Sequence, residues 1–264
     1  MSTFYSDEHK DYLKKKRKNK ILVLSTQLLI LILFFMLWEL LAKYNLINTF
    51  FYSSPSKIFI TLVNLFESNS LFNHIFITLY EVILSFIIAF VVGIVVASIL
   101  WWNKFLSRVM DPYLTILNSL PKVALGPLII IWAGASMNSI IVMSLMISLI
   151  ITIINLYNGF INTDKNYITL LKTFKASRWC IFTKVILPSN RVNIVNTLKI
   201  NMSMNFIGVV MGELLVSKEG LGYLIMYGSQ VFNINLVLTS IVILGILSSL
   251  FYYFINYLEK KTMH

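Results

Sequence analysis

The sequence has little charge, few acidic residues and almost no cysteine. Only 12% of its 264 residues are charged and 58% are hydrophobic, whereas an average soluble domain is about 25% charged. The single cysteine, Cys180, excludes an intramolecular disulfide and with it a secreted disulfide scaffold. Because a soluble fold cannot bury this much apolar surface, the composition also excludes a disordered chain and an ordinary soluble enzyme.

The residues that would make a catalytic or metal site are missing as well. The sequence has no G-x-x-x-x-G-K-[ST] loop that could cradle nucleotide phosphates. Its three histidines, His9, His74 and His264, lie far apart, and no metal-ligand spacing or nucleophile cluster is present. We therefore expect that the chain is not an enzyme and binds no cofactor or metal.

Long apolar segments dominate the sequence instead. A helix needs about 20 residues to cross a bilayer. Six segments are long enough, and they lie at residues 21–42, 74–102, 113–135, 140–160, 196–216 and 235–258. Pro121 and Pro127 disfavour a straight helix in the third. The sequence thus predicts an all-α, polytopic membrane protein with six transmembrane helices.

The basic residues indicate how these spans are oriented. The net charge is +11, which in a soluble protein would suggest nucleic-acid binding, but in a membrane protein Lys and Arg gather in cytoplasmic loops. If both termini lie on the cytoplasmic side, only Lys43, Lys57 and Lys218 of the 22 basic residues fall on the outer side of the membrane. We therefore predict an N-in/C-in topology and no nucleic-acid partner, and the basic N-terminal residues are a candidate contact for anionic membrane lipid.

The spans divide the chain into consecutive regions. We expect a basic cytoplasmic tail, a first transmembrane helix, an extracellular linker with an interfacial helix after Pro55, a core transmembrane domain and a second cytoplasmic tail. Their residue ranges are 1–20, 21–43, 44–73, 74–258 and 259–264. Inside the core domain, residues 103–112 are expected to form a short loop.

The polar segment at residues 161–190 is too long to be a simple connection. Four apolar residues share one face of a predicted short helix, namely Tyr167, Leu170, Leu171 and Phe174. Asp164 is a candidate cap for this helix and Ser177 for a second one, which Pro188 ends. The apolar face packs either on the protein's own membrane helices or in a groove of a cytoplasmic partner, and the periodicity alone does not decide between the two.

The same segment resembles the coupling loop of permeases from binding-protein-dependent ABC importers. That motif reads Glu-Ala-Ala, three residues, Gly, nine residues, Ile-x-Leu-Pro. The spacing is kept here, with Thr169 in place of the Glu and Lys175 in place of the Gly. A Gly would serve a left-handed turn, a conformation that costs Lys175 about 1 kcal/mol. The resemblance implies an ATPase contact at Tyr167, Leu170, Leu171, Phe174, Lys175, Ala176, Ser177, Arg178, Leu187 and Pro188.

Other stretches are similar to the nitrate, sulfonate and taurine branch of this family. They are Trp38-Glu39-Leu40, Gly93, Leu120 to Gly134, Gly212-Glu213-Leu214-Leu215 and Gly220-Leu221-Gly222-Tyr223. The resemblance implies a type I ABC importer permease in a bacterial cytoplasmic membrane, which works as a homodimer. It also implies two ATPase subunits that bind ATP and Mg²⁺, and an extracellular solute-binding protein. Heterodimers remain open, as do sulfonates, nitrate, taurine, vitamin precursors and amino-acid-like compounds as substrates.

Polar residues inside the spans are candidates for the translocation path, because an ionisable group there costs about 2.5–3.5 kcal/mol. The candidates are Glu81, Asn118, Lys122, Asn201, Asn205 and Glu213. Alternatives stay open: Glu81 at the outer interface, Lys122 reaching the cytoplasm, and Glu213 in a structural or gating role. The branch resemblance implies Arg at position 81, so the Glu there argues against assuming an anionic substrate.

A self-contained secondary transporter is the main alternative function. That class predicts internal repeats and several intramembrane charges for ion coupling. The sequence shows no clear repeat and few such charges, which favours the importer permease.

Overall fold

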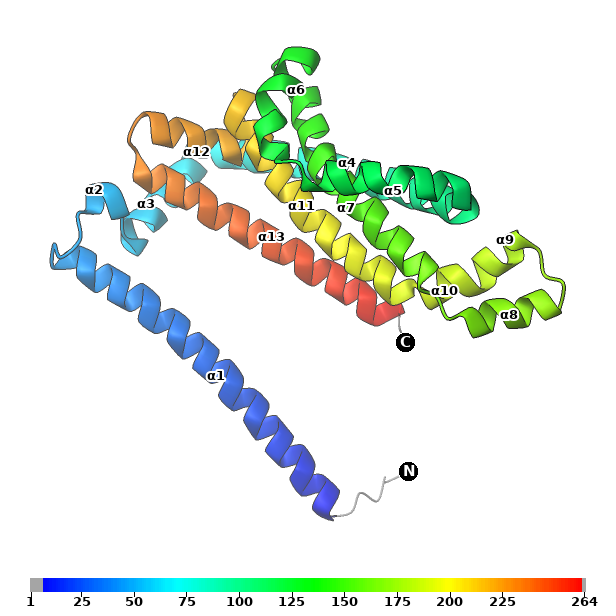
Figure 1. Cartoon of the computed structure of the whole chain (residues 1–264). Helices are drawn as coiled ribbons and strands as arrows, with labels where there is room; N and C mark the ends of the chain where they lie inside the picture. Colours follow the sequence, from blue (N-terminus) through cyan, green and yellow to red (C-terminus); the bar gives the residue numbers. More distant parts are fainter. Residues whose placement is uncertain (1–6, 263–264) are drawn as a thin grey trace. The chain divides into compact units, whose positions relative to one another are not determined.

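The computed structural model describes residues 7–262, and within this range every regular element is a helix (Figure 1). The chain divides into two compact units, residues 1–61 and 62–264. Five helices are long and apolar enough to cross a membrane, and a bent pair supplies a sixth crossing if it counts as one. The all-α, multi-span architecture expected from composition is thereby confirmed.

The first unit consists of a long helix and a short return. It contains α1 (Asp7–Lys43), α2 (Thr49–Tyr52) and the start of α3 (Pro55–Glu67). The Glu39 carboxylate near the end of α1 accepts hydrogen bonds from Ser56 N–H at 3.0 Å and Ser56 Oγ at 2.8 Å. Proline suits the first position of a helix and an acid suits its N-terminal turn. Glu39 therefore caps α3.

The N-terminal basic segment is helical where the structure describes it. Lys14 to Lys20 form part of α1, so the helix begins well before the expected start of the span at residue 21. Residues 1–6 of the predicted tail lie outside the described residues, as do residues 263–264 of the C-terminal tail.

The second unit holds the remaining helices, which follow one another along the chain with short breaks between them. They are α4 (Ser70–Trp102), α5 (Lys104–Ser119), η1 (Lys122–Leu125), α6 (Gly126–Ala133), α7 (Met137–Ile161), α8 (Lys165–Thr173), α9 (Arg178–Ile181), η2 (Phe182–Ile186), α10 (Leu187–Ser189), α11 (Arg191–Val216), α12 (Leu221–Gln230) and α13 (Ile234–Thr262). Here η1 is a 3₁₀-helix and η2 a π-helix.

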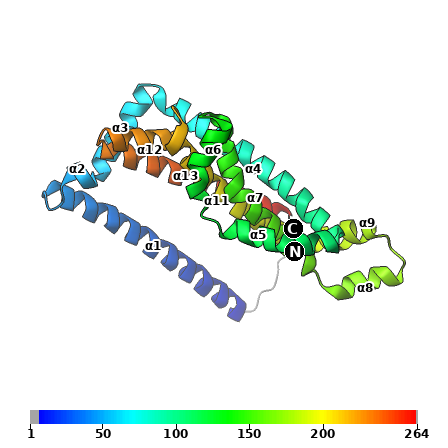
Figure 2. The same ribbon diagram turned by 45° about the horizontal axis from the view of Figure 1, so that its top comes forward.

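Helices α4, α7 and α11 form the centre of this unit, and α13 runs beside α11 and α12 (Figures 1 and 2). Small residues let the central backbones approach closely, as is common between membrane helices. At Gly208 on α11, an added Cβ would lie 2.4 Å from the Ser144 Cα on α7. The crossing of α7 and α11 therefore depends on a residue without a side chain at position 208.

The third predicted span is broken rather than continuous. Helices α5 and η1–α6 meet at an angle of 86°. Leu120 between them is extended, with ψ 141°, because a residue before proline is disfavoured in the helical region. The expected break near Pro121 is therefore present, and Pro127 lies in the first turn of α6.

The predicted loop at residues 103–112 is wrong, because α5 begins at Lys104. Asn103 Oδ1 accepts hydrogen bonds from Phe105 N–H and Leu106 N–H, both at 3.1 Å. This cap starts a new helix directly after α4. Pro112 is accommodated inside α5.

Candidate functional site

The segment at residues 161–190 forms a helix–turn–helix, as the sequence predicts. Figure 1 shows α8 and α9 projecting from the end of the second unit, beyond the junction of α7 and α11. Asp164 Oδ1 accepts from Asn166 N–H at 2.8 Å and caps α8. Ser177 Oγ accepts from Cys180 N–H at 3.2 Å and caps α9. Both predicted caps are confirmed.

The turn between α8 and α9 has the left-handed geometry that a Gly would provide. Lys175 has φ 55°. Its N–H donates to Lys172 O at 2.9 Å, and Ala176 N–H donates to Leu171 O at 3.0 Å. These two bonds define a Schellman motif, which usually has Gly at this position. Lys175 thus replaces the family Gly without changing the expected turn.

We expect Lys175→Gly to stabilise the chain, because it removes the left-handed strain, by up to about 1 kcal/mol. Lys172→Gly is the matched control, because Lys172 lies within α8, where Gly costs about 0.5–1 kcal/mol. Thermal unfolding of the purified protein in detergent measures both changes. Equal destabilisation by the two variants would contradict the strained turn.

One side of the helix–turn–helix is anchored to the membrane helices. Its buried residues Ile181, Phe182 and Ile186 form a hydrophobic cluster with Ala97 of α4 and with Leu156 and Phe160 of α7, and Ile168, Leu171 and Ala176 pack against this cluster. A movement of α8 and α9 therefore reaches α4 and α7 through direct packing.

The other side of α8 is exposed. Tyr167, Leu170 and Phe174 have exposed fractions of 57%, 54% and 75%, and we call these three residues the docking face. The two packing alternatives for the predicted apolar face therefore apply to different residues, because Leu171 packs on the chain's own helices while the docking face remains uncovered.

Aromatic residues strengthen the anchor. The ring of Trp179 stacks on Trp102 at the end of α4, with centroids 5.5 Å apart, and Phe182 contacts Trp101 and Trp102 with centroids 5.1 Å apart. Arg178 Nη1 donates to Trp102 O at 3.5 Å. The contact of this Trp pair with the loop was not predicted from the sequence.

A buried carboxylate joins α11, α12 and α4 at the far end of the second unit. Glu213 is 1% exposed. Its Oε1 accepts from Thr78 Oγ1 at 2.6 Å, and its Oε2 accepts from Gly222 N–H. Thr78 Oγ1 in turn accepts from Leu221 N–H at 2.8 Å. Glu213 therefore holds the first turn of α12 against α4.

The glycines of this turn are required by the same carboxylate. Gly220 has φ 101°, which side-chain-bearing residues rarely adopt, and its added Cβ would lie 2.3 Å from Glu213 Oε1. His74 Nδ1 accepts from Gly220 N–H at 3.0 Å. The two stretches around Glu213 and Gly220, which carried the family resemblance, thus form one structural contact.

Glu81 lies beside this contact. It is 2% exposed, and its carboxyl group lies against that of Glu213. Within the described residues its Oε2 has no hydrogen-bond partner. The Glu81 side chain is therefore covered by the protein's own helices.

A second polar network lies between α7 and α11. Asn205 Oδ1 accepts from Ser144 Oγ at 2.7 Å and from Ser148 Oγ at 3.2 Å. Asn205 Nδ2 donates to Asn201 O at 2.8 Å, and Ser144 Oγ is 3.1 Å from Ser85 Oγ. All five residues are buried. These side chains bond α4, α7 and α11 to one another.

The last two path candidates lie at the break of the third span. Lys122 Nζ donates to Asn118 Oδ1 at 3.2 Å, and Asn118 is exposed while Lys122 is half-buried. The six path candidates therefore fall in three separate places: the Glu81–Glu213 contact, the Asn201–Asn205 network and the Asn118–Lys122 pair.

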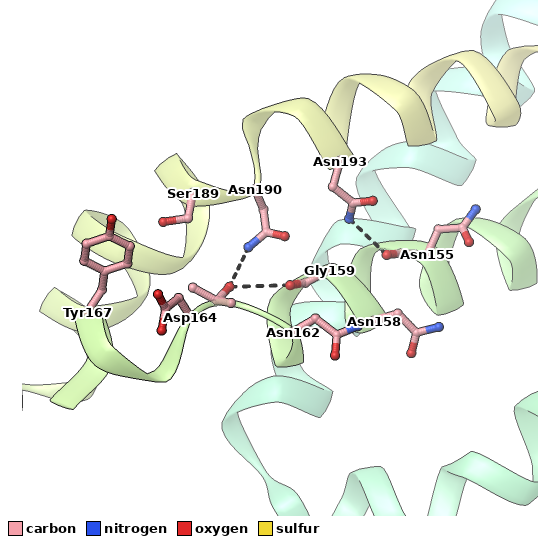
Figure 3. A pocket seen from close by; sticks show the side chains of 10 residues that line it. Asn155, Asn158, Gly159, Asn162, Asp164, Tyr167, Ser189, Asn190 and Asn193 are labelled. Atoms are coloured by element: carbon pink, nitrogen blue, oxygen red, sulfur yellow. Dashed lines mark hydrogen bonds between the residues drawn. The ribbon is translucent and has the colours of Figure 1, made fainter.

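An amide-lined pocket of about 550 Å³ opens beside the start of α8 (Figure 3). Asn190 Nδ2 donates to Thr163 Oγ1 at 2.7 Å, and Asn193 Nδ2 donates to Asn155 O at 3.1 Å. These bonds tie the end of α7 to the start of α11. This pocket was not predicted from the sequence, although its Asn residues recur near both helix ends.

The chain matches a protein family and several known proteins. Residues 89–264 match the family described as "Binding-protein-dependent transport system inner membrane component". A probable ABC transporter permease protein of Haemophilus influenzae is 31% identical over 89% of this chain and 95% of the relative. A putative aliphatic sulfonates transport permease protein of Bacillus subtilis is 26% identical over 86% and 82%.

Two further comparisons extend the similarity. A formylaminopyrimidine transport permease protein of Halalkalibacterium halodurans is 27% identical over 74% of this chain and 77% of the relative. A solved chain of the MetNI methionine ABC transporter superposes with a TM-score of 0.64 over 71% of this chain and 94% of that chain, at 21% identity. The structural match shows the same fold.

Proposed function

The chain belongs to the family of inner membrane components of binding-protein-dependent transport systems, and from this premise we propose that it couples solute import to a separate ATPase through the α8–α9 segment. Members of this family are multi-pass permease subunits of ABC importers in the cytoplasmic membrane, and this chain is such a permease and not an enzyme.

The observation that carries the proposal is the division of α8 into two faces. Ile168 and Leu171 pack against the cluster at the ends of α4 and α7, whereas the docking face is exposed. A helix anchored on one side and uncovered on the other is suited to insert into a groove of a partner. The cytoplasmic ATPase is the partner we assign to the docking face.

Force passes from the docking face to the spans through packed side chains. When the ATPase subunits close on ATP and Mg²⁺, they displace α8. The aromatic contacts of Trp179 and Phe182 with Trp102 transmit this displacement to the end of α4. Because packed interiors resist compression, a rigid-body shift of the spans is the expected response, and it exposes the path alternately to the two sides.

We propose that two identical copies form the translocation path. Each copy would contribute Glu81, Asn118, Lys122, Asn201, Asn205 and Glu213 to the path or to its gates. The buried contacts of Glu213 favour a gating role for it, because they hold the first turn of α12 against α4. Co-purification of two differently tagged copies tests the homodimer, and recovery of only one tag would contradict it.

The inward orientation of α8 follows from the distribution of basic residues. Single cysteines introduced in a Cys180→Ser background test it. A cysteine that replaces Phe232 is expected to react with an impermeant maleimide added to intact cells. A cysteine that replaces Leu170 is expected to react only after the membrane has been permeabilised. The opposite pattern would overturn the topology.

Reconstitution separates the importer from a secondary transporter. We expect uptake into proteoliposomes to require the permease, the ATPase, ATP and the external binding protein together. Uptake driven by an ion gradient without the ATPase would contradict the proposal. Solute specificity is assigned to the external binding protein, whose binding measurements would identify the substrate.

A further inference from the structure

A large pocket lies on the side of α8 that faces the membrane helices. Its volume is about 960 Å³, and it is lined by the end of α4, the start of α5, the end of α7 and parts of α8 and α9. Apolar side chains, including Trp101, Trp102, Phe160 and Ile181, form part of its wall. The pocket is separate from the docking face, since Tyr167, Leu170 and Phe174 do not line it.

The pocket also gathers positive charge from three elements. Lys104 of α5, Lys165 and Lys172 of α8, and Arg178 of α9 line it, and no acidic residue does. Within residues 7–262, none of these four forms an ion pair with a carboxylate. Four cations without a neutralising acid favour an anion, and the five donors of Arg178 suit phosphate oxygens in particular.

The depth of the pocket points to a lipid. It lies where two candidate spans end, at Trp102 of α4 and Ile161 of α7. Tryptophan is enriched at the level of the lipid headgroups, and basic pockets between spans on the cytoplasmic side bind anionic headgroups. An apolar wall with a basic rim matches a phospholipid, which presents both surfaces to the protein.

We infer that this pocket binds the headgroup of an anionic phospholipid. The inference rests on the proposed inward orientation of α8. Lys172 and Ile168 line the pocket, whereas Leu170 lies on the opposite, exposed side of the same helix. A bound lipid therefore supports α8 from the membrane side while the ATPase contacts it from the cytoplasm, and coupling depends on the lipid.

Native mass spectrometry of the permease–ATPase complex tests the inference. The complex in neutral detergent is titrated with phosphatidylglycerol and, separately, with phosphatidylcholine of the same acyl chains. We expect the wild type to prefer phosphatidylglycerol. Lys104→Gln combined with Lys172→Gln is expected to weaken this binding about 30-fold, given the typical contribution of each basic residue near an anionic surface. Lys184→Gln is the matched control, because Lys184 is exposed in the same segment but does not line the pocket.

Three results would overturn the inference: equal binding of the two lipids, unchanged binding by the double variant, or complete displacement of the lipid by excess inorganic phosphate. The spectra report assembly with the ATPase at the same time. If the double variant does not assemble with the ATPase, Lys104→Gln alone is tested instead, because Lys104 lies on α5 outside the helix–turn–helix. Loss of lipid binding with normal ATPase assembly separates this inference from the proposed function.

Discussion

Replacing Phe174 with aspartate is expected to abolish both ATPase binding and transport. Phe174 has the largest exposed fraction of the docking face, at 75%, so the charge does not disturb the permease's own core. In a complex, the same charge would be buried in the ATPase groove. Loss of an aromatic hot spot costs about 2–4 kcal/mol, which corresponds to roughly 30- to 1,000-fold in affinity. Co-purification with the ATPase and ATP-driven uptake measure the effect.

Asn166→Asp is the matched control for the added charge. Asn166 is exposed in the first turn of α8, where an acidic residue is favourable, and it is not part of the docking face. This variant is expected to assemble and transport normally. If Phe174→Asp still co-purified with the ATPase and supported uptake, α8 would not be the coupling helix.

Gly208→Ala is expected to destabilise the permease itself. The new Cβ would lie 2.4 Å from Ser144 Cα, which forces the backbones of α7 and α11 apart. The separation would also stretch the hydrogen bonds of Asn205 to Ser144 and Ser148. Overpacking of this kind costs about 1–3 kcal/mol. A lower thermal unfolding temperature in detergent is the measurement.

Gly245→Ala provides the comparison for this prediction. An added Cβ at Gly245 on α13 would meet no atom within 4 Å, and alanine favours a helix over glycine by about 0.5–1 kcal/mol. This variant is expected to unfold at the same temperature as the wild type or higher. Equal losses from the two substitutions would show that the α7–α11 crossing is not the critical contact.

Periodicity and composition were sufficient to predict most of the helices and the helix–turn–helix at residues 161–190. The caps at Asp164 and Ser177 depend on neighbouring residues, and local sequence therefore reveals them. The left-handed turn at Lys175 was expected only from the resemblance to the family motif, because a Lys gives no local sign of it. The start of α5 was missed because Asn103 is typical of loops as well as of helix caps.

Contacts between residues that lie far apart in the sequence could not be predicted from the sequence. Thr78 and Glu213 are 135 positions apart, and nothing local to either indicates that they bond. The division of the apolar face of α8 is of the same kind, because Leu171 packs against a cluster that includes residues of α4 and α7. The periodicity of a helix shows which side chains share a face, but tertiary packing decides which residues cover that face.

Site-specific photocrosslinking tests the central claim most directly. A photoreactive phenylalanine analogue is placed at Leu170, on the docking face, and in a separate variant at Phe232. Phe232 is 70% exposed in the turn between α12 and α13, on the side assigned to the exterior. The account predicts a crosslink to the ATPase from position 170 and none from position 232. A crosslink from position 232 and none from position 170 would contradict it.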